Sequence, residues 1–256
     1  MFVIKNGKVL DAIHREPQYV DIRVENGKIT EIGPNLIADG GDVIDAAGLT
    51  VMPGFVEAHG HIGLDGYGEP GVDYNEMNDI CCPQLRAIDG VDPMDHSFEL
   101  ARNAGVTCVC TGPGSANVLG GTFTVIKTAG KRIDDMIVKQ TAAMKCAFGE
   151  NPKRCYNSKC DSTRMTTAAI LREALMKARL YLQKKEAAGD DVFRQPAFDM
   201  KLEALIPVLR GQIPLKAHAH QLNDLFTAIR IAKEFGVKLT LEHCTEGQLA
   251  AERFAA

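Results

Sequence analysis

The feature that most constrains the fold of this chain is the order of its strand-length and helix-length segments. From residue 49 onward, apolar runs such as VTCVCTG, MKCAFGE, IPLKAHAH and VKLTLEHC alternate with amphipathic segments of helical length. Those segments are HSFELARNAG, TTAAILREALMKARLYLQKKEAAG and NDLFTAIRIAKEFG, and each of them ends at a glycine. Strands that alternate with helices of this length indicate a parallel sheet with crossover helices, and therefore an α/β fold.

Residues 1–50 have a different pattern of short strands and turns. Two Asn-Gly pairs, Asn6-Gly7 and Asn26-Gly27, lie between apolar runs, which is the strongest short-range signal for a β-hairpin. We predict a small antiparallel β module over residues 1–50 and a second domain over residues 51–256. A module of this size buries too little core to be stable alone, so it has to pack on something else.

The composition is that of a globular protein and excludes several other classes. Hydrophobic residues make up 45% of the chain and charged residues 24%, with a formal net charge of −4. No Lys/Arg block suggests a nucleic-acid partner, and no run approaches the roughly 18 apolar residues of a membrane span. The start, MFVIKNGKVLD, becomes polar too early for a secretory signal. We expect a cytoplasmic protein with a small-molecule substrate and no membrane partner, either a monomer or a homo-oligomer, whose cysteines are reduced, buried thiols.

Side chains that can bind metals gather where the predicted strands end. The candidates come from four strands and are His59, His61, Glu150, His218, His220 and His243. Because residues i and i+2 of a strand point to the same side, both members of each His-x-His pair face the same way. In parallel α/β proteins, ligands bind beyond the carboxyl ends of the strands. Several imidazoles with a carboxylate suit zinc, with iron, manganese or cobalt as alternatives, and a metal with an open position can activate water against an amide-like C–N bond.

These motifs resemble those of the amidohydrolase superfamily in type and in order. MPGFVEAHGHIG is similar to its PGxxDxHxH opening, KAHAHQLND to its fifth-strand histidine segment, and LEHCTEG to its sixth-strand one. TGPGSANVLGG and MKCAFGENPKR resemble the imidazolonepropionase-related branch. The resemblance implies a TIM-type (β/α) barrel, preceded here by a small N-terminal module that forms part of a β-sandwich.

The resemblance also assigns metal-binding roles by position. It implies that His59, His61, His218 and His243 bind one or two divalent ions, with zinc as the favoured metal. The fourth-strand ligand is a carboxylated lysine in many members and a glutamate in others. We predict Glu150 for this position, with two lysines as competing candidates, Lys145 and Lys153.

Three further residues receive roles from the resemblance. His220 would act in catalysis by polarising or holding the substrate, although a structural histidine is the alternative. Arg154 would contact an anionic substrate, although a solvated surface charge is the alternative. Glu57 stands where the family usually has an aspartate that orients a ligand histidine. The segment GPGSANVLGG is either a plain loop or a set of backbone N–H groups that face a substrate carboxylate.

The family completes its barrel with two more strands, and the eighth carries an aspartate that binds metal and takes a proton from the attacking water. After His243, Glu246 and Glu252 fall in a predicted turn and helix rather than at a strand end. We therefore expect an incomplete barrel with weak or absent turnover. The favoured function is metal-dependent hydrolysis of an amide or cyclic amide. The alternatives are a non-catalytic remnant that binds metal or a partner, and a barrel completed by a second chain.

Overall fold

A computed structural model describes residues 1–66, 72–156 and 162–254 of the chain. The chain divides into two compact units, Met1–Phe55 and Val56–Ala256. The sequence-based boundary lies after residue 50, close to this division. Within the described ranges, no helix is both long enough and apolar enough to cross a bilayer.

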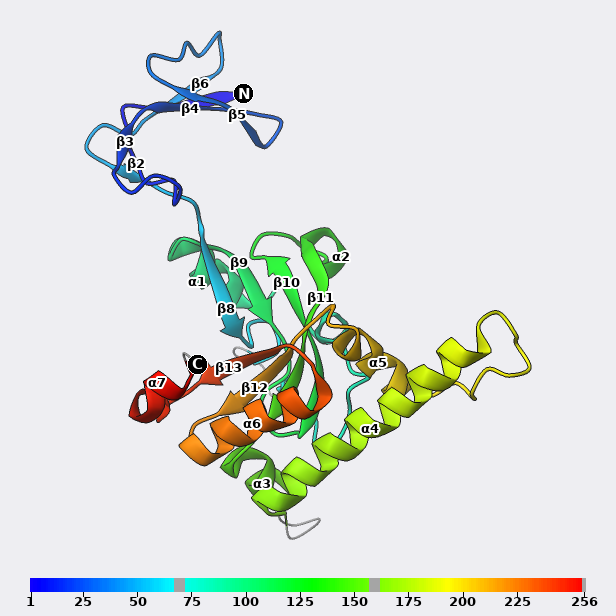
Figure 1. Cartoon of the computed structure of the whole chain (residues 1–256). Coiled ribbons are helices and arrows are strands. Elements are labelled where there is room, and N and C mark those ends of the chain that lie inside the picture. Colours follow the sequence, from blue (N-terminus) through cyan, green and yellow to red (C-terminus); the bar gives the residue numbers. More distant parts are fainter. Residues whose placement is uncertain (67–71, 157–161, 255–256) are drawn as a thin grey trace. The chain divides into compact units, whose positions relative to one another are not determined.

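The first unit consists of short strands in two small sheets (Figure 1). One sheet has the order β5-β4-β1-β6 and the other the order β3-β2-β7. Their bounds are β1 (Phe2–Lys5), β2 (Lys8–Val9), β3 (Gln18–Tyr19), β4 (Asp21–Glu25), β5 (Lys28–Gly33), β6 (Asp42–Asp45) and β7 (Thr50–Val51). The predicted module is present, but it is not purely antiparallel, because β1 pairs with β6 and β2 pairs with β7 in parallel.

Only one of the two Asn-Gly pairs forms the predicted hairpin. Asn26 and Gly27 have φ values of 51° and 73°, and they join the antiparallel strands β4 and β5. A two-residue turn of this type needs a positive φ at both central residues. Asn6 has φ 63°, but its backbone N–H and side-chain amide are held by Asp21 and Asp45, and the chain passes from one sheet to the other. The hairpin prediction at Asn6-Gly7 is therefore wrong.

The second unit is built around a six-stranded sheet of order β13-β12-β11-β10-β9-β8 (Figure 1). The strands are β8 (Phe55–Gly60), β9 (Val106–Thr111), β10 (Leu119–Lys127), β11 (Ile137–Ala147), β12 (Leu215–Ala219) and β13 (Leu239–His243). The sheet is strongly curved. Its two edge strands, β8 and β13, come so close together that the ring centroids of His59 and His243 lie 5.3 Å apart. The fold is an incomplete TIM-type barrel, as the sequence predicts.

Strand β10 corrects the prediction of a purely parallel sheet. Strands β11, β12 and β13 are parallel, whereas β10 runs antiparallel to both β9 and β11. The sequence predicts either a plain loop or a set of substrate-facing N–H groups for residues 112–121, because they are rich in turn formers, but the last three of them belong to β10. Gly121 is required for close packing rather than for a loop, since a Cβ there would lie 2.5 Å from the carbonyl oxygen of Leu85. The preceding Asn117 is also structural, because its buried amide donates to the carbonyls of Glu76 and Asp79.

Helices cover the outer face of this sheet. They are η1 (Ala87–Asp89), α1 (His96–Asn103), α2 (Ile133–Met136), α3 (Glu150–Tyr156), α4 (Arg164–Ala188), α5 (Met200–Leu209), α6 (Leu222–Phe235), η2 (Gly247–Ala250) and α7 (Ala251–Phe254). The helices predicted from HSFELARNAG, TTAAILREALMKARLYLQKKEAAG and NDLFTAIRIAKEFG are confirmed as α1, α4 and α6. Thr163 caps α4 through a capping box, and Gly236 ends α6 in the left-handed conformation.

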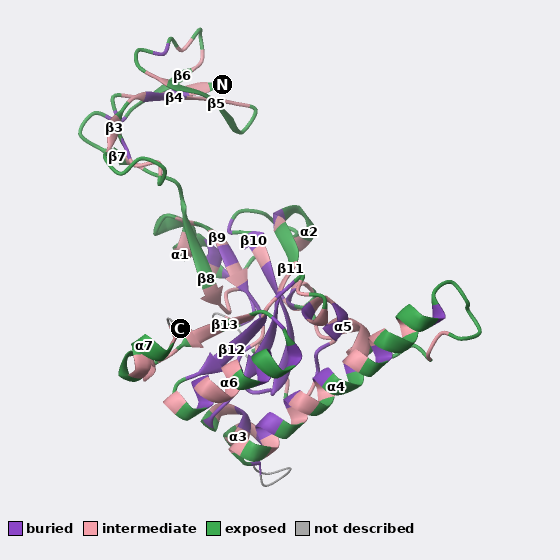
Figure 2. Cartoon of the chain, in the orientation of Figure 1, coloured by how far each residue is buried: buried purple, intermediate pink, exposed green. Residues whose placement is uncertain are grey.

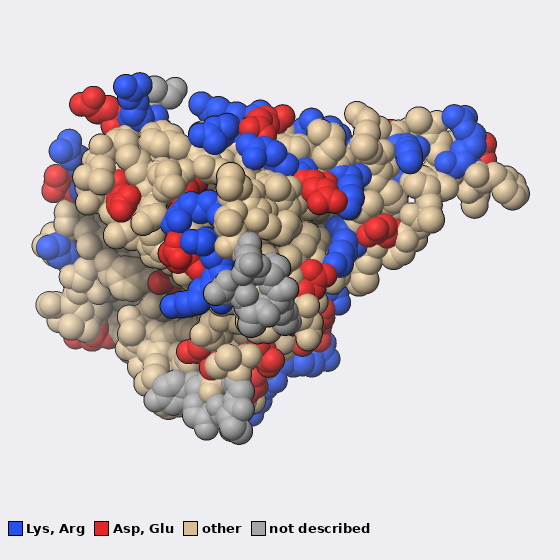
Figure 3. All heavy atoms as spheres, turned by 90° about the horizontal axis from the view of Figure 1, so that it is seen from below, with Lys and Arg blue, Asp and Glu red and all other residues tan. Residues whose placement is uncertain are grey.

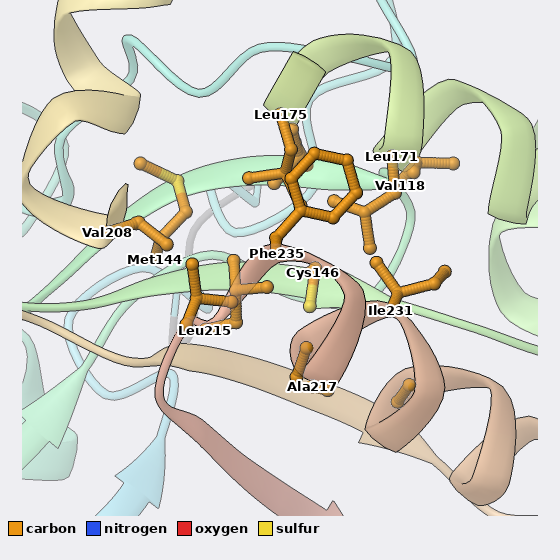
Figure 4. Packing of buried hydrophobic residues seen from close by; sticks show 14 of the residues in the cluster. Val118, Met144, Cys146, Leu171, Leu175, Val208, Leu215, Ala217, Ile231 and Phe235 are labelled. Atoms are coloured by element: carbon orange, nitrogen blue, oxygen red, sulfur yellow. The ribbon is translucent and has the colours of Figure 1, made fainter. Parts of the chain in front are cut away.

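The main core lies between the sheet and helices α4, α5 and α6 (Figures 2 and 4). Leu171 and Leu175 of α4, Val208 of α5, and Ile231 and Phe235 of α6 meet the outer side chains of β11 and β12. On the molecular face in Figure 3, Lys and Arg side chains are interspersed with Asp and Glu rather than gathered in one patch. The packed outer face fixes which side chains of each strand can enter the interior.

Candidate metal centre

Strand alternation sends a set of ionisable side chains into the interior of the curved sheet. The side chains of β11 and β12 that belong to the helix-facing core are Met144, Cys146, Leu215, Ala217 and Ala219. The side chains between them, Lys145, Lys216 and His218, therefore point to the inner face. Lys145 and Lys216 are register partners on the parallel pair of strands, so they lie next to each other there.

Strand β13 brings two neighbouring residues, Glu242 and His243, to the histidine cluster by breaking this alternation, and His243 lies on its exposed side. Glu242 is the register partner of His218 and shares its inner face, so alternation alone would turn His243 outward. His243 and Cys244 have φ values of 70° and 48°, a conformation that non-glycine residues seldom adopt. This turn at the end of the strand brings the His243 ring to 4.6 Å from that of His218.

Five histidine rings from three strands lie together at the carboxyl ends of the sheet. Ring centroids are 5.4 Å apart for His59 and His61, 4.6 Å for His218 and His220, and 5.0 Å for His220 and His243. His59 connects the two groups through its 5.3 Å separation from His243. The structure thus brings together all five histidines that the sequence singled out. They come from segments that are far apart in the sequence, including both edge strands of the sheet.

Burial favours the neutral form of four of these imidazoles, those of His59, His61, His218 and His243. It lowers the pKa of both His59 and His218 to about 3, and the charge of Lys145 contributes further in each case. Burial also lowers the pKa of His61 and of His243. Neutral imidazole is the state that binds a metal ion, so these rings do not have to lose a proton to become ligands near neutral pH.

Several polar atoms in the interior have no hydrogen-bond partner among the residues that the structure describes. They are both ring nitrogens of His59, Nδ1 of His218 and Nζ of Lys145. Buried polar atoms are normally paired, so such a group needs an explanation. A cation bound between the rings would satisfy the nitrogens, which have the donor chemistry that zinc prefers. In the described part of the chain, however, no three His, Cys, Asp or Glu side chains are already close enough to hold an ion, so the rings would have to adjust.

Lys145 is the side chain from β11 that lies among these histidines. It is fully buried, its Nζ is 5.6 Å from the centroid of the Phe123 ring, and its charge influences the pKa of His59, His61, His218 and His243. Burial lowers the pKa of Lys145 itself to about 8. A substantial fraction of this amine is therefore neutral near physiological pH, which makes it a potential nucleophile or ligand.

Glu150, the predicted fourth-strand ligand, lies elsewhere. Strand β11 ends at Ala147, and Gly149, with φ 80°, turns the chain so that Glu150 begins helix α3. The Glu150 side chain is 63% exposed, and its Oε1 lies 2.9 Å from both Lys153 Nζ and Arg164 Nη1. The hydrogen bond from Lys153 holds the pKa of Glu150 below its usual value. The structure thus replaces Glu150 and Lys153 with Lys145 as the side chain next to the histidines.

The remaining predicted site residues lie at the rim or on the surface. His220 is exposed, with its Nδ1 2.7 Å from the Thr245 hydroxyl and its ring stacked on His243. His61 Nδ1–H donates a hydrogen bond of 2.7 Å to the carbonyl oxygen of Gly112, which leaves Nε2 as the acceptor nitrogen of a neutral ring. Arg154 is exposed on α3, the helix that also carries Glu150.

Sequence reasoning missed three residues that lie next to the histidines, namely Lys216, Glu242 and Phe123. Lys216 Nζ lies 2.7 Å from Glu242 Oε1, and Glu242 Oε2 lies 3.3 Å from His59 Nδ1. The buried ring of Phe123 stacks under His59 at a centroid distance of 5.3 Å and an interplanar angle of 25°. The signal for Lys216 was present in the pattern KAHAH, because Lys216 precedes His218 by two residues on the same face.

Glu57 does not contact the ring of a ligand histidine. Its Oε1 accepts a hydrogen bond of 3.0 Å from the backbone N–H of His59. The residue therefore supports the backbone at the end of β8 rather than the orientation of the imidazole. The orienting role that the resemblance implies for this position has to be filled by another group.

The described cysteines are free thiols. Burial raises the pKa of Cys81 to about 11 and that of Cys82 to about 12, so neither is a thiolate near neutral pH. Cys146 belongs to the helix-facing core. Cys82 and Cys146 are buried, as predicted, whereas the other described cysteines are only half-buried.

Comparison with solved structures finds a close match. The crystal structure of an amidohydrolase from Thermotoga maritima superposes with a TM-score of 0.94 at 40% sequence identity, covering 100% of this chain and 67% of that one. The match extends over both units of the chain. No protein-family model matches the chain.

Comparison with curated proteins gives more distant relatives. The amidohydrolase tasK of Hapsidospora irregularis is 30% identical over 262 residues, which is 91% of this chain and 26% of that protein. A dihydroorotase of Elusimicrobium minutum is 27% identical over 284 residues, which is 99% of this chain and 62% of that enzyme. The chain therefore spans only part of the length of the curated relatives it matches.

Proposed function

Because the chain belongs to the amidohydrolase superfamily, we propose that it is a metal-dependent hydrolase that cleaves a C–N bond of an amide or cyclic amide. The observation that carries this proposal is the convergence of neutral histidines from β8, β12 and β13 around a buried, unpartnered lysine. Such an interior costs free energy unless a ligand satisfies it. A divalent cation is the ligand that suits these donors.

The proposed metal ligands are His59, His61, His218, His243 and Lys145. When bound, one or two divalent ions, with zinc favoured by the nitrogen and oxygen donors, supply an acidified water and a Lewis acid for the substrate carbonyl. The chain's own contribution is to hold the imidazoles neutral by burial and to exclude competing water from their lower side with the ring of Phe123.

Lys145 would join this set after modification by carbon dioxide. Its neutral amine attacks the carbon of CO₂, a C–N bond forms, and the nitrogen releases a proton, which leaves a carbamate anion. The lowered pKa of Lys145 favours this step, because only the unprotonated amine can attack. The product replaces a buried cation beside Lys216 with an anion that offers two oxygen donors. This change turns an electrostatic cost in the interior into a site for cations.

His220 and Arg154 are proposed to act on the substrate. His220 lies exposed at the rim and is held by Thr245, so its Nε2 can face a substrate carbonyl above the cluster. Arg154 would attract an anionic group from the surface of α3. Cyclic amides of the kind that a dihydroorotase opens, and the imidazolone ring suggested by the branch that the sequence resembles, are the substrates to test first.

Metal analysis together with a hydrolysis assay tests the proposal. Purified protein should retain a divalent metal, and His59→Ala, His218→Ala and Lys145→Ala should each lower the metal content. His14→Ala is the matched control, because His14 is exposed and pairs with Asp11 in the first unit. Full metal occupancy in His59→Ala or His218→Ala would contradict the ligand assignment. Bound metal without hydrolysis of any amide would favour the non-catalytic alternative.

A further inference from the structure

We propose that Glu242, anchored by Lys216, orients the ring of His59 for metal binding. The inference rests on the proposed function, because it concerns the same centre. Glu242 is on β13, on the inner face that it shares with its register partner His218. Its carboxylate is largely buried, with one oxygen 2.7 Å from Lys216 Nζ and the other 3.3 Å from His59 Nδ1.

Among the described residues, His59 lacks the Nδ1 hydrogen bond that His61 and His220 have. His61 has the carbonyl of Gly112 at its Nδ1, and His220 has the hydroxyl of Thr245 at its Nδ1. A histidine that binds a metal through one nitrogen is normally oriented by a hydrogen bond from the other. Glu57, which stands where the resemblance implies a residue that orients a ligand histidine, binds the backbone N–H of His59 instead. The group that the structure places next to His59 Nδ1 is Glu242.

The contact is an ion-pair approach rather than an aligned hydrogen bond, because neither ring nitrogen of His59 makes a hydrogen bond. Binding of a cation at Nε2 would draw electron density from the ring and make its Nδ1–H a stronger donor. The carboxylate already lies within reach of that proton. We therefore expect the His59–Glu242 hydrogen bond to form together with the metal bond, so that each strengthens the other.

Two neighbouring groups restrict the geometry. The face of the Phe123 ring supports His59 from below at 5.3 Å, which limits how the imidazole can tilt. Lys216 fixes the other end of the Glu242 carboxylate, and its Nζ also lies 5.6 Å from the centroid of the same Phe123 ring. Glu242 and His59 come from the two edge strands of the sheet, so their contact also links β13 to β8 at the site.

The test is the affinity of the whole protein for cobalt or zinc, measured by competition with a chromophoric chelator. Glu242→Gln keeps the size of the side chain but removes its charge, and it should weaken binding by roughly 10- to 100-fold. The matched control is Glu234→Gln on α6. It removes a surface carboxylate that pairs with Arg172 of α4, and it should leave the metal affinity unchanged. The visible spectrum of the cobalt form should also change in Glu242→Gln alone, because the ring geometry differs.

The outcomes separate this inference from the function on which it rests. If the wild type and Glu234→Gln bind cobalt tightly and Glu242→Gln binds it equally tightly with an identical spectrum, the orienting role is wrong and the metal site stands. If the wild type itself binds no metal, both are wrong. Should Glu242→Gln fail to fold, Glu242→Asp keeps the charge but shortens its reach to His59. Unaltered affinity in that variant would likewise overturn the inference.

Discussion

Replacing Lys145 with methionine should stabilise the metal-free protein while it weakens metal binding. Lys145 is fully buried, its Nζ has no hydrogen-bond partner, and methionine is an unbranched side chain that can fill the same space. Burial lowers the pKa of Lys145 from 10.5 to about 8. At about 1.36 kcal/mol per pKa unit, the ammonium costs the folded protein about 3 kcal/mol.

The sign of the pH dependence follows from this lowered pKa. The unfolded chain holds the proton more tightly, so the cost is fully present below about pH 8 and disappears as the pH rises through 10.5. At pH 7, Lys145→Met should be more stable than the wild type by about 3 kcal/mol. At pH 9.5 the advantage should shrink by about half, because most of the buried amine is then already neutral in the folded state.

Urea unfolding at pH 7 and at pH 9.5, after removal of metal and bicarbonate, measures this difference. Comparing the two proteins at each pH cancels the titration of all other groups. Adding zinc and bicarbonate should reverse the order of stability, because only the wild type can form the carbamate ligand. A variant that is less stable than the wild type at pH 7 without metal, or an advantage that does not change with pH, would refute the account of Lys145.

Three further predictions concern other parts of the second unit. Glu150→Gln should leave both the metal content and the midpoint of urea unfolding unchanged, because it removes only solvent-screened ion pairs with Lys153 and Arg164. Metal-free protein should lose stability as the pH falls from 6.5 towards about 3, because His59 and His218 stay neutral in the folded state and take up protons on unfolding; acid titration followed by circular dichroism would show a flat profile if this is wrong. Leu175→Ala should cost about 2–5 kcal/mol in thermal or urea unfolding, because this side chain is fully buried between α4 and the sheet, and a smaller loss would show that the core collapses around the cavity.

The sequence predicted the histidine cluster because strand periodicity and strand ends are local signals. The pattern KAHAH places His218 and His220 on one face, and the Pro-Gly turn before His59 marks the start of β8. His243 lies in the cluster for a reason that periodicity does not contain. Its ring reaches those of His218 and His220 because the backbone at the end of β13 adopts a positive φ.

The choice between Glu150 and Lys145 could not be made from local pattern. A carboxylate after a strand is a common metal ligand, and a lysine inside an apolar strand is seldom fully buried. The decisive facts are where β11 ends and how Gly149 turns the chain, and both depend on packing against β12 and α6. The side chain of Asp224 on α6 lies where a Cβ at Gly149 would clash, at 2.8 Å.

Strand β10 and the pair of Lys216 with Glu242 were missed for similar reasons. Two glycines near the start of β10 have the composition of a loop, but a Cβ at Gly121 would lie 2.5 Å from the carbonyl oxygen of Leu85, and one at Gly120 would lie 3.3 Å from the side chain of Pro113. The Glu242 contacts depend on the register of β13 against β12 and on the curvature that brings β8 close. Neither the register nor the curvature is encoded in a short window of sequence.

The most direct test of the metal centre is an anomalous-scattering map from crystals of the protein loaded with zinc and bicarbonate. The account predicts a zinc peak between the rings of His59, His218 and His243, with additional density for a carboxylate on Lys145 Nζ. Zinc bound only at surface residues, with these rings turned apart and Lys145 unmodified, would contradict it.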